Sequence, residues 1–138
     1  MSAVIDHMRK VPLFRGMSTS ALETVADRAT ETTFADGETV TREGEPGNTF
    51  YIVTDGRLHV SKEGTMVRDL GPGDFLGEIA LIDHGRRTAS ATAETDCRLL
   101  VLGHREFHSL LDAQPDIRVH VLEALARRVR QLTPEHEV

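Results

Sequence analysis

The sequence predicts a mainly β domain, a sandwich or barrel, with helices at both ends. Between about residues 34 and 102, short β-favouring runs alternate with turn signals at near-regular spacing, which is typical of sandwiches and barrels. On both sides of this part, apolar residues recur at helical spacing instead. A length of 138 residues fits one domain with one modest core.

Helical segments precede the predicted strands. Apolar side chains between residues 5 and 14 form an entry segment around Pro12. Ser18 and Ser20 are candidate caps for the next helix, because a serine hydroxyl can accept a hydrogen bond from a backbone N–H of the first turn. Four residues at helical spacing then define one apolar face: Leu22, Val25, Ala26 and Ala29.

The predicted strands are separated by glycine-containing turns. Asp36-Gly37, Asp55-Gly56 and Glu63-Gly64 are turn signals, since glycine adopts the backbone conformations that tight turns require. A jelly roll can expose a short helix between two of its strands, and the stretch after Asp74 lies where such an insertion would be. The clearest strand candidates cover residues 50–53, 57–60, 66–70, 88–92 and 98–102.

The last third of the chain is predicted to be helical. Phe107, Leu110 and Leu111 form a short apolar stripe, and Pro115 suits the start of a second helix. Thr133-Pro134 ends that helix, and the few residues after it are expected to fray. Apolar residues recur along the second helix: Val121, Leu122, Leu125, Val129 and Leu132.

Composition and charge narrow the function classes. Hydrophobic residues make up 39% and charged residues 28%, as in soluble globular proteins, and the net charge is −6. That charge argues against a nucleic-acid surface, which requires a basic face. No apolar run approaches about 18 residues, and the first residues show no apolar core of the kind found in signal peptides. The single Cys97 excludes an internal disulfide framework and fits a reducing compartment. Taken together, the charge, the apolar runs and the cysteine count lead us to expect a cytoplasmic protein that binds no membrane and, by itself, no nucleic acid.

The stretch from residue 73 to 93, GDFLGEIALIDHGRRTASATA, is the candidate site. One acid, Glu78, follows Gly77, and two arginines, Arg86 and Arg87, come after a short apolar turn. The N–H groups at the start of a helical turn attract an anion, and arginine grips one through paired donors. A carboxylate accepts a hydrogen bond from a hydroxyl. The stretch therefore predicts a small anionic ligand that also carries a hydroxyl.

This stretch resembles the phosphate-binding cassette of cyclic nucleotide-binding domains, whose pattern is F-G-E-x-A-L-apolar, a gap, then R-[STA]-A. Here it is FLGEIALI at residues 75–82 and RTA at 87–89, with Leu76 as an extra residue, as in the catabolite-activator branch. The run GRRTAS is similar to the pacemaker-type channels, and protein kinase A regulatory subunits belong to the same family. The resemblance, over about residues 11–132, implies a jelly roll (double-stranded β-helix) with N-terminal helices, a short cassette helix and a C-terminal lid helix.

The resemblance also implies a role for each site residue. Arg87, the ninth residue after Glu78, would hold the phosphate, and Glu78 would accept the ribose 2′-hydroxyl; Arg86 would be a surface charge. A solvated acid at Glu78 and a plain strand residue at Thr88 are the alternatives, and the Thr88 hydroxyl could instead reach the phosphate or a guanine amino group. The residues implied to contact phosphate and ribose through their backbone are Gly77, Ile79, Ala80, Thr88 and Ala89.

Other positions would surround the base. Val60, Arg68 and Leu70 align with the base pocket of the channels, and Arg128 and Leu132 align with the helix that closes over the base. Ordinary strand residues, a solvated arginine and a core leucine are the alternatives. The expected ligand is cAMP, in preference to cGMP, with no metal.

The expected function is that of a stand-alone, bacterial-type sensor without enzymatic activity. Ligand binding would shift a population of conformers, and the C-terminal helix would pass the change to an unknown effector protein. A second copy of the chain, in a homodimer, is an additional candidate partner. Residues 1–10 would be a lead-in, 11–132 the domain and 133–138 a tail, too short for a DNA-binding module. The chain would then be either a complete partner-binding sensor or a piece of a larger protein.

Two other function classes remain open. The first is an interaction module that kept the fold and lost the ligand, which the presence of both Glu78 and Arg87 disfavours. The second is a cupin-like metal enzyme, which the lack of a clustered His-x-His motif disfavours. His104 and His108, four residues apart on a predicted helix, have a metal-binding spacing but no evident third ligand.

Overall fold

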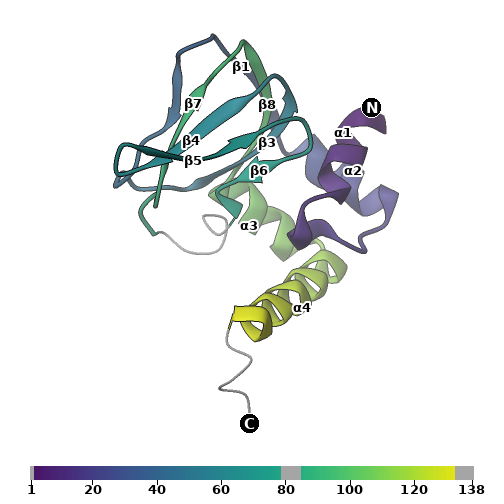
Figure 1. The fold of residues 1–138 in the computed structure, drawn as a ribbon. Helices are drawn as coiled ribbons and strands as arrows, with labels where there is room; N and C mark the ends of the chain where they lie inside the picture. Colours follow the sequence, from purple (N-terminus) through teal and green to yellow (C-terminus); the bar gives the residue numbers. More distant parts are fainter. Residues whose placement is uncertain (1, 79–84, 133–138) are drawn as a thin grey trace.

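The computed structural model describes residues 2–78 and 85–132. It consists of two packed antiparallel sheets with helices against one side and one end of the sandwich (Figure 1). The strands are β1 (Thr30–Phe34), β2 (Thr39–Thr41), β3 (Thr49–Asp55), β4 (Leu58–Lys62), β5 (Thr65–Leu70), β6 (Phe75–Leu76), β7 (Ser90–Ala93) and β8 (Cys97–Gly103). The helices are α1 (Ser2–Arg9), the 3₁₀ helix η1 (Pro12–Phe14), α2 (Thr19–Asp27), α3 (His104–Ala113) and α4 (Pro115–Leu132).

The strand order is that of an eight-stranded jelly roll. Sheet A has the order β1-β8-β3-β6 and sheet B the order β2-β7-β4-β5, so strands adjacent in sequence repeatedly lie in different sheets. The tight β3–β4 connection contains Gly56, whose φ is +86° and whose added Cβ would lie 2.3 Å from the Asp96 carbonyl oxygen. Only glycine fits that turn. The predicted fold class is confirmed.

Sheet A separates two hydrophobic cores because side chains of a strand alternate between its faces. On one face, Phe50 and Ile52 of β3 pack among the helices, and the Phe50 ring meets Phe14 edge to face at 5.9 Å. On the other face, Val53 packs between the sheets with Leu58 of β4. The sandwich is therefore held to its helices and closed on itself through the same strand.

The N-terminal helices form as the sequence predicts. The Ser18 hydroxyl oxygen caps α2 by accepting a hydrogen bond from the Ala21 N–H at 3.1 Å. Leu22 and Val25 are buried on the inner face of this helix. α1 packs against α2 and β3, while α4 packs against η1 and α3 and runs away from the sandwich (Figure 1).

Several predictions are adjusted by the structure. The expected strand at 88–92 begins only at Ser90, because Thr88 and Ala89 form a bend at the rim of the sandwich. The apolar residues of α4 divide between two faces, since Val121 is buried while Leu122 and Val129 are exposed. The predicted cassette helix lies outside the described residues. Among the described helices, none has both the length and the apolar composition that crossing a lipid bilayer requires.

Candidate functional site

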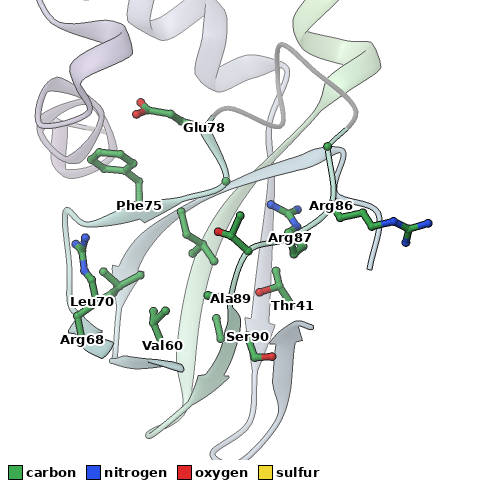
Figure 2. A pocket seen from close by; sticks show the side chains of 15 residues that line it. Thr41, Val60, Arg68, Leu70, Phe75, Glu78, Arg86, Arg87, Ala89 and Ser90 are labelled. Atoms are coloured by element: carbon green, nitrogen blue, oxygen red, sulfur yellow. The ribbon is translucent and has the colours of Figure 1, made fainter. Parts of the chain in front are cut away.

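A cavity of about 520 Å³ lies against sheet B, within the range of about 300–1,000 Å³ of small-molecule sites (Figure 2). Strand register builds one row of its wall, in which Thr41 of β2 pairs with Ala91 of β7, Ala91 with Val60 of β4, and Val60 with Arg68 of β5. The remaining lining residues come from the end of β5, from β6, and from the segments on either side of residues 79–84: Leu70, Phe75, Leu76, Gly77, Glu78, Gly85, Arg86, Arg87, Thr88, Ala89 and Ser90.

Arg87 supplies a half-buried positive charge to this cavity. Its Nη2 donates a hydrogen bond to the Thr49 carbonyl oxygen at 2.6 Å, and its guanidinium carbon lies 5.8 Å from the centre of the Tyr51 ring. Burial lowers the pKa of the Arg87 guanidinium, and the charge of ionised Tyr51 would raise it. An arginine still carries its charge at neutral pH, so the group is held in place to meet an anion.

Two glycines make room for the Arg87 side chain. A Cβ at Gly47 would lie 2.5 Å from Arg87 Nε. A Cβ at Gly77 would lie 2.4 Å from Arg87 Nη1 and 2.8 Å from the Thr49 carbonyl oxygen, and Gly77 has a φ of +80°. The glycine before the acid is therefore required both by its backbone conformation and by the closeness of the guanidinium.

Arg86 differs from its neighbour in exposure and in partners. Its side chain is exposed and its Nη1 donates a hydrogen bond to the Gly44 carbonyl oxygen at 2.8 Å, while its backbone forms an isolated bridge with Pro46. Figure 2 shows Arg86 pointing outward, away from Ala89 and Val60. Arg86 therefore ties the loop before β3 to the cavity rim.

Glu78 is buried, with only 6% of its surface exposed, and lines the cavity. Its carboxylate is turned away from Arg87 in Figure 2. An acid in this position is a hydrogen-bond acceptor, but it meets a ligand in the cavity only if the side chain turns.

The other end of the cavity is largely apolar. Val60, Leu70 and Ala89 lie there together in Figure 2, with Phe75 and Arg68 at the side. Leu70 is 1% exposed and belongs to the core between the sheets, whereas Arg68 is exposed. A charged end and a largely apolar end match a ligand that has an anionic group and a less polar body.

Eight residues that the resemblance places around the ligand line this cavity: Gly77, Glu78, Arg87, Thr88, Ala89, Val60, Arg68 and Leu70. Ile79 and Ala80 lie outside the described residues. The backbone of α4 includes Arg128 and Leu132, but their side chains are outside what the structure describes. Of the α4 side chains that are described, none lines the cavity, so the role of α4 as a lid stays a prediction.

Sequence reasoning missed residues that long-range pairing brings to the cavity. Thr41 is contributed by β2, and Ala91 and Ser90 by β7. No local motif marks Thr41, because only the pairing of β2 with β7 carries it to the wall. Phe75 and Leu76 also line the cavity and were not predicted to do so, although both lie in the stretch that resembles the phosphate-binding cassette. The aromatic residue before Gly77 was the signal that could have identified them.

Two groups of side chains resemble metal donors, and both are away from the cavity. His59 Nδ1 lies 4.0 Å from Asp69 Oδ1 and 4.0 Å from Glu94 Oε1, with all three side chains at least one-third exposed. His59 and Asp69 precede the cavity-facing Val60 and Leu70, so this trio lies on the outer face of sheet B. A hydrogen bond with Asp69, more than burial, raises the pKa of Glu94, while Arg57 and His59 lower it. The trio is thus part of a surface charge network.

The His104 and His108 rings lie side by side on α3, with centroids 4.2 Å apart and planes tilted by 46°. In the part of the chain that is described, no further His, Cys or carboxylate completes a donor set around them. A cupin-type centre would lie inside the sandwich, whereas the one set of three donors found among the described residues is the trio on its outer face.

Comparison with known proteins agrees with this geometry. Residues 31–114 match the family model of the cyclic nucleotide-binding domain. The chain is 31% identical over 90% of its length to a CRP-like cAMP-activated global transcriptional regulator of Mycobacterium tuberculosis, and spans 58% of that protein. It is also 32% identical, over 98% of its length, to the potassium/sodium hyperpolarization-activated cyclic nucleotide-gated channel 3 of Mus musculus, spanning 17% of that channel.

Among solved structures, the N-terminal domain of a transcriptional regulator from Streptomyces coelicolor A3(2) superimposes with a TM-score of 0.90. The two share 33% sequence identity, and the match covers 96% of this chain and 99% of that one. The family match, the jelly roll and the arginine-bearing cavity agree. The chain belongs to the cyclic nucleotide-binding domain family.

Proposed function

We propose that the protein is a sensor that binds a cyclic nucleotide, cAMP in preference to cGMP, and acts by binding rather than by catalysis. The observation that carries the proposal is the half-buried Arg87, oriented by Thr49 and Tyr51 at the charged end of the cavity. The ligand's phosphate would pair with this guanidinium through charge-assisted hydrogen bonds. The base would lie over the apolar end, at Val60 and Leu70. Residues 11–132 would form the working unit.

A thermal-shift panel tests this proposal at low cost. A ligand that binds only the folded state raises the melting temperature by mass action. We expect cAMP and, less strongly, cGMP to raise it, whereas divalent metals leave it unchanged. A metal shift alone would favour an enzyme of cupin type, and no shift at all would favour an interaction module that does not bind nucleotide.

Glu78→Gln is expected to weaken cAMP binding by only about fivefold, because the ribose 2′-hydroxyl keeps a neutral acceptor and loses about 1 kcal/mol of charge assistance. This contact requires the buried carboxylate to turn toward the cavity. The measurement is a double-mutant-style cycle with calorimetric titration of cAMP and its 2′-deoxy analogue into both proteins. If the two losses simply add, Glu78 does not touch that hydroxyl.

cAMP is expected to bind more tightly than cGMP. Glu78 is the one carboxylate that the described residues bring to the cavity, so the N1–H and N2 amino edge of guanine would lack a carboxylate that pairs with both donors at the apolar end. Leaving one of these donors buried and unpaired costs about 1–3 kcal/mol, which exceeds one exposed hydrogen bond of about 1 kcal/mol from Thr88.

Calorimetric titration of both nucleotides into wild type and Thr88→Ala tests this preference. We expect cAMP to remain the tighter ligand in Thr88→Ala, and the ratio of the two affinities to change by no more than a few-fold. Tighter cGMP binding in the wild type that disappears in Thr88→Ala would contradict the proposal and identify Thr88 as the discriminating residue.

The output would pass through α4 to an effector protein or to a second copy of the chain. Its inner face is occupied, since Ile117 and Val121 are buried, but Val119, Leu122 and Val129 are more than half exposed. Val119 and Leu122 are three residues apart, and Leu122 and Val129 are seven apart, so the three side chains form one stripe along the helix. An exposed apolar stripe of this kind marks a contact surface.

Leu122→Glu is expected to abolish self-association without lowering the melting temperature, because Leu122 is 60% exposed. Sedimentation equilibrium measures the mass of the wild type and of Leu122→Glu as a function of concentration. Val121→Glu is the matched contrast: Val121 is only 2% exposed, so a charge there should unfold the protein. A wild type that stays monomeric at every concentration would contradict the homodimer and leave the effector protein as the partner of the stripe.

A further inference from the structure

Thr41 is a buried polar residue in the wall of the cavity. It is 8% exposed, and its hydroxyl oxygen has no hydrogen-bond partner among the described residues. Most buried hydroxyls in proteins have such a partner, because a buried hydroxyl without one loses its hydrogen bonds to water without compensation. A valine has nearly the same shape and would avoid this cost, so the hydroxyl itself requires an explanation.

The strand pairing places Thr41 at the cavity. It lies opposite Ala91 in β7, at the β2 end of the row formed by Thr41, Ala91, Val60 and Arg68, and all four line the cavity. Figure 2 shows its hydroxyl oxygen on the side of the residue that faces Ala89. A ligand lying over this row is therefore the nearest source of a partner, and rotation about the single Cα–Cβ bond is enough to bring the hydroxyl to it.

Strand pairing indicates which part of the ligand is near Thr41. Thr41 pairs with Ala91, and Ala91 pairs with Val60, where the base of the proposed ligand would lie. The part of a nucleotide nearest this row is therefore its base. A hydroxyl both donates and accepts hydrogen bonds, so it suits the mixed polar edge of either purine.

We propose that Thr41 forms a polar subsite in which its hydroxyl hydrogen-bonds to the edge of the purine base. This inference rests on the proposed cyclic nucleotide function and adds a base contact on β2, a strand outside the stretch that holds the phosphate. Because the hydroxyl serves either adenine or guanine, the subsite contributes affinity for both nucleotides and does not select between them.

The test compares Thr41→Val, which removes the hydroxyl at constant shape, with Thr41→Ser, which keeps it. Thr39→Val is the matched control, since Thr39 lies on the same strand and does not line the cavity. Calorimetric titration of cAMP and cGMP should show a loss of roughly 3- to 10-fold for both ligands in Thr41→Val and less than half of that loss in Thr41→Ser. Thr39→Val should bind as the wild type does. Without ligand, Thr41→Val should melt at a higher temperature than the wild type, because an unpaired buried hydroxyl is gone.

Unchanged affinity of Thr41→Val for both nucleotides would overturn the subsite while leaving the proposed function intact. An equal loss in Thr41→Val and Thr41→Ser would also overturn it, because the effect would then come from packing and not from the hydroxyl. If the wild type bound neither nucleotide, the proposed function itself would fail. The higher melting temperature of ligand-free Thr41→Val would still be observable in that case, so the two failures are distinguishable.

Discussion

Arg87→Ala is expected to weaken cAMP binding by at least about 30-fold and at most several thousandfold, with the fold intact. Truncating one partner of a desolvated charge pair costs about 2–5 kcal/mol, and the half-buried position of Arg87 favours the lower part of that range. The same change removes the hydrogen bond to the Thr49 carbonyl oxygen. Calorimetric titration of cAMP measures the affinity, and circular dichroism melting confirms that the protein is folded.

Arg86→Ala is the matched control for this prediction. It removes an arginine of the same charge one residue away, whose side chain is exposed and bonded to the Gly44 carbonyl oxygen. We expect the affinity to change by less than about threefold, as for a solvent-screened charge. Equal losses in the two variants would mean that both arginines hold the phosphate, or that the choice of Arg87 is wrong.

Gly77→Ala is expected to reduce cAMP affinity by roughly 10- to 150-fold, the equivalent of one charge-assisted hydrogen bond of about 1.5–3 kcal/mol. The added Cβ would overlap the Arg87 Nη1, which must move, and the Thr49 carbonyl oxygen, which cannot move cheaply because it belongs to the backbone of β3. A positive φ of +80° adds about 1–2 kcal/mol of strain for any residue with a Cβ.

Gly64→Ala separates the two causes. Gly64 also has a φ of +80°, but a Cβ there meets nothing within 4 Å, and the residue lies in the β4–β5 hairpin away from the cavity wall. It should lose stability by the same strain and keep the wild-type affinity for cAMP. If Gly64→Ala lost as much affinity as Gly77→Ala, the loss would come from general destabilisation and not from the position of Arg87.

The fold was predictable because its signals are local. Turn glycines such as Gly56, alternation in β3 and the serine cap of α2 each involve residues close in sequence, and the structure contains all three. The division of α4 into two faces was less predictable. Val121 and Leu122 are adjacent and equally apolar, and only the packing of α4 against η1 and α3 decides which is buried.

The candidate site was predictable only where the family resemblance covers it, which includes Val60 and Leu70 outside the motif. Gly77, Glu78 and Arg87 came from the motif, and the structure brings all three to one cavity. The groups that orient Arg87 are Tyr51 and the Thr49 carbonyl, which belong to β3 and lie at least 36 positions earlier in the sequence. Such a contact depends on strand register, which no local pattern encodes. Thr41 was missed for the same reason.

The most direct test of the central claim is an NMR titration of the isotope-labelled protein with cAMP, followed through backbone amide shifts. Binding in this cavity predicts saturable shifts concentrated at Gly77, residues 85–91, Val60 and Leu70, with little change in β1 or at the Glu63-Gly64 turn. These shifts should disappear at the same cAMP concentration in Arg87→Ala. A folded wild type without saturable shifts, or with shifts confined to surfaces away from the cavity, would contradict the account.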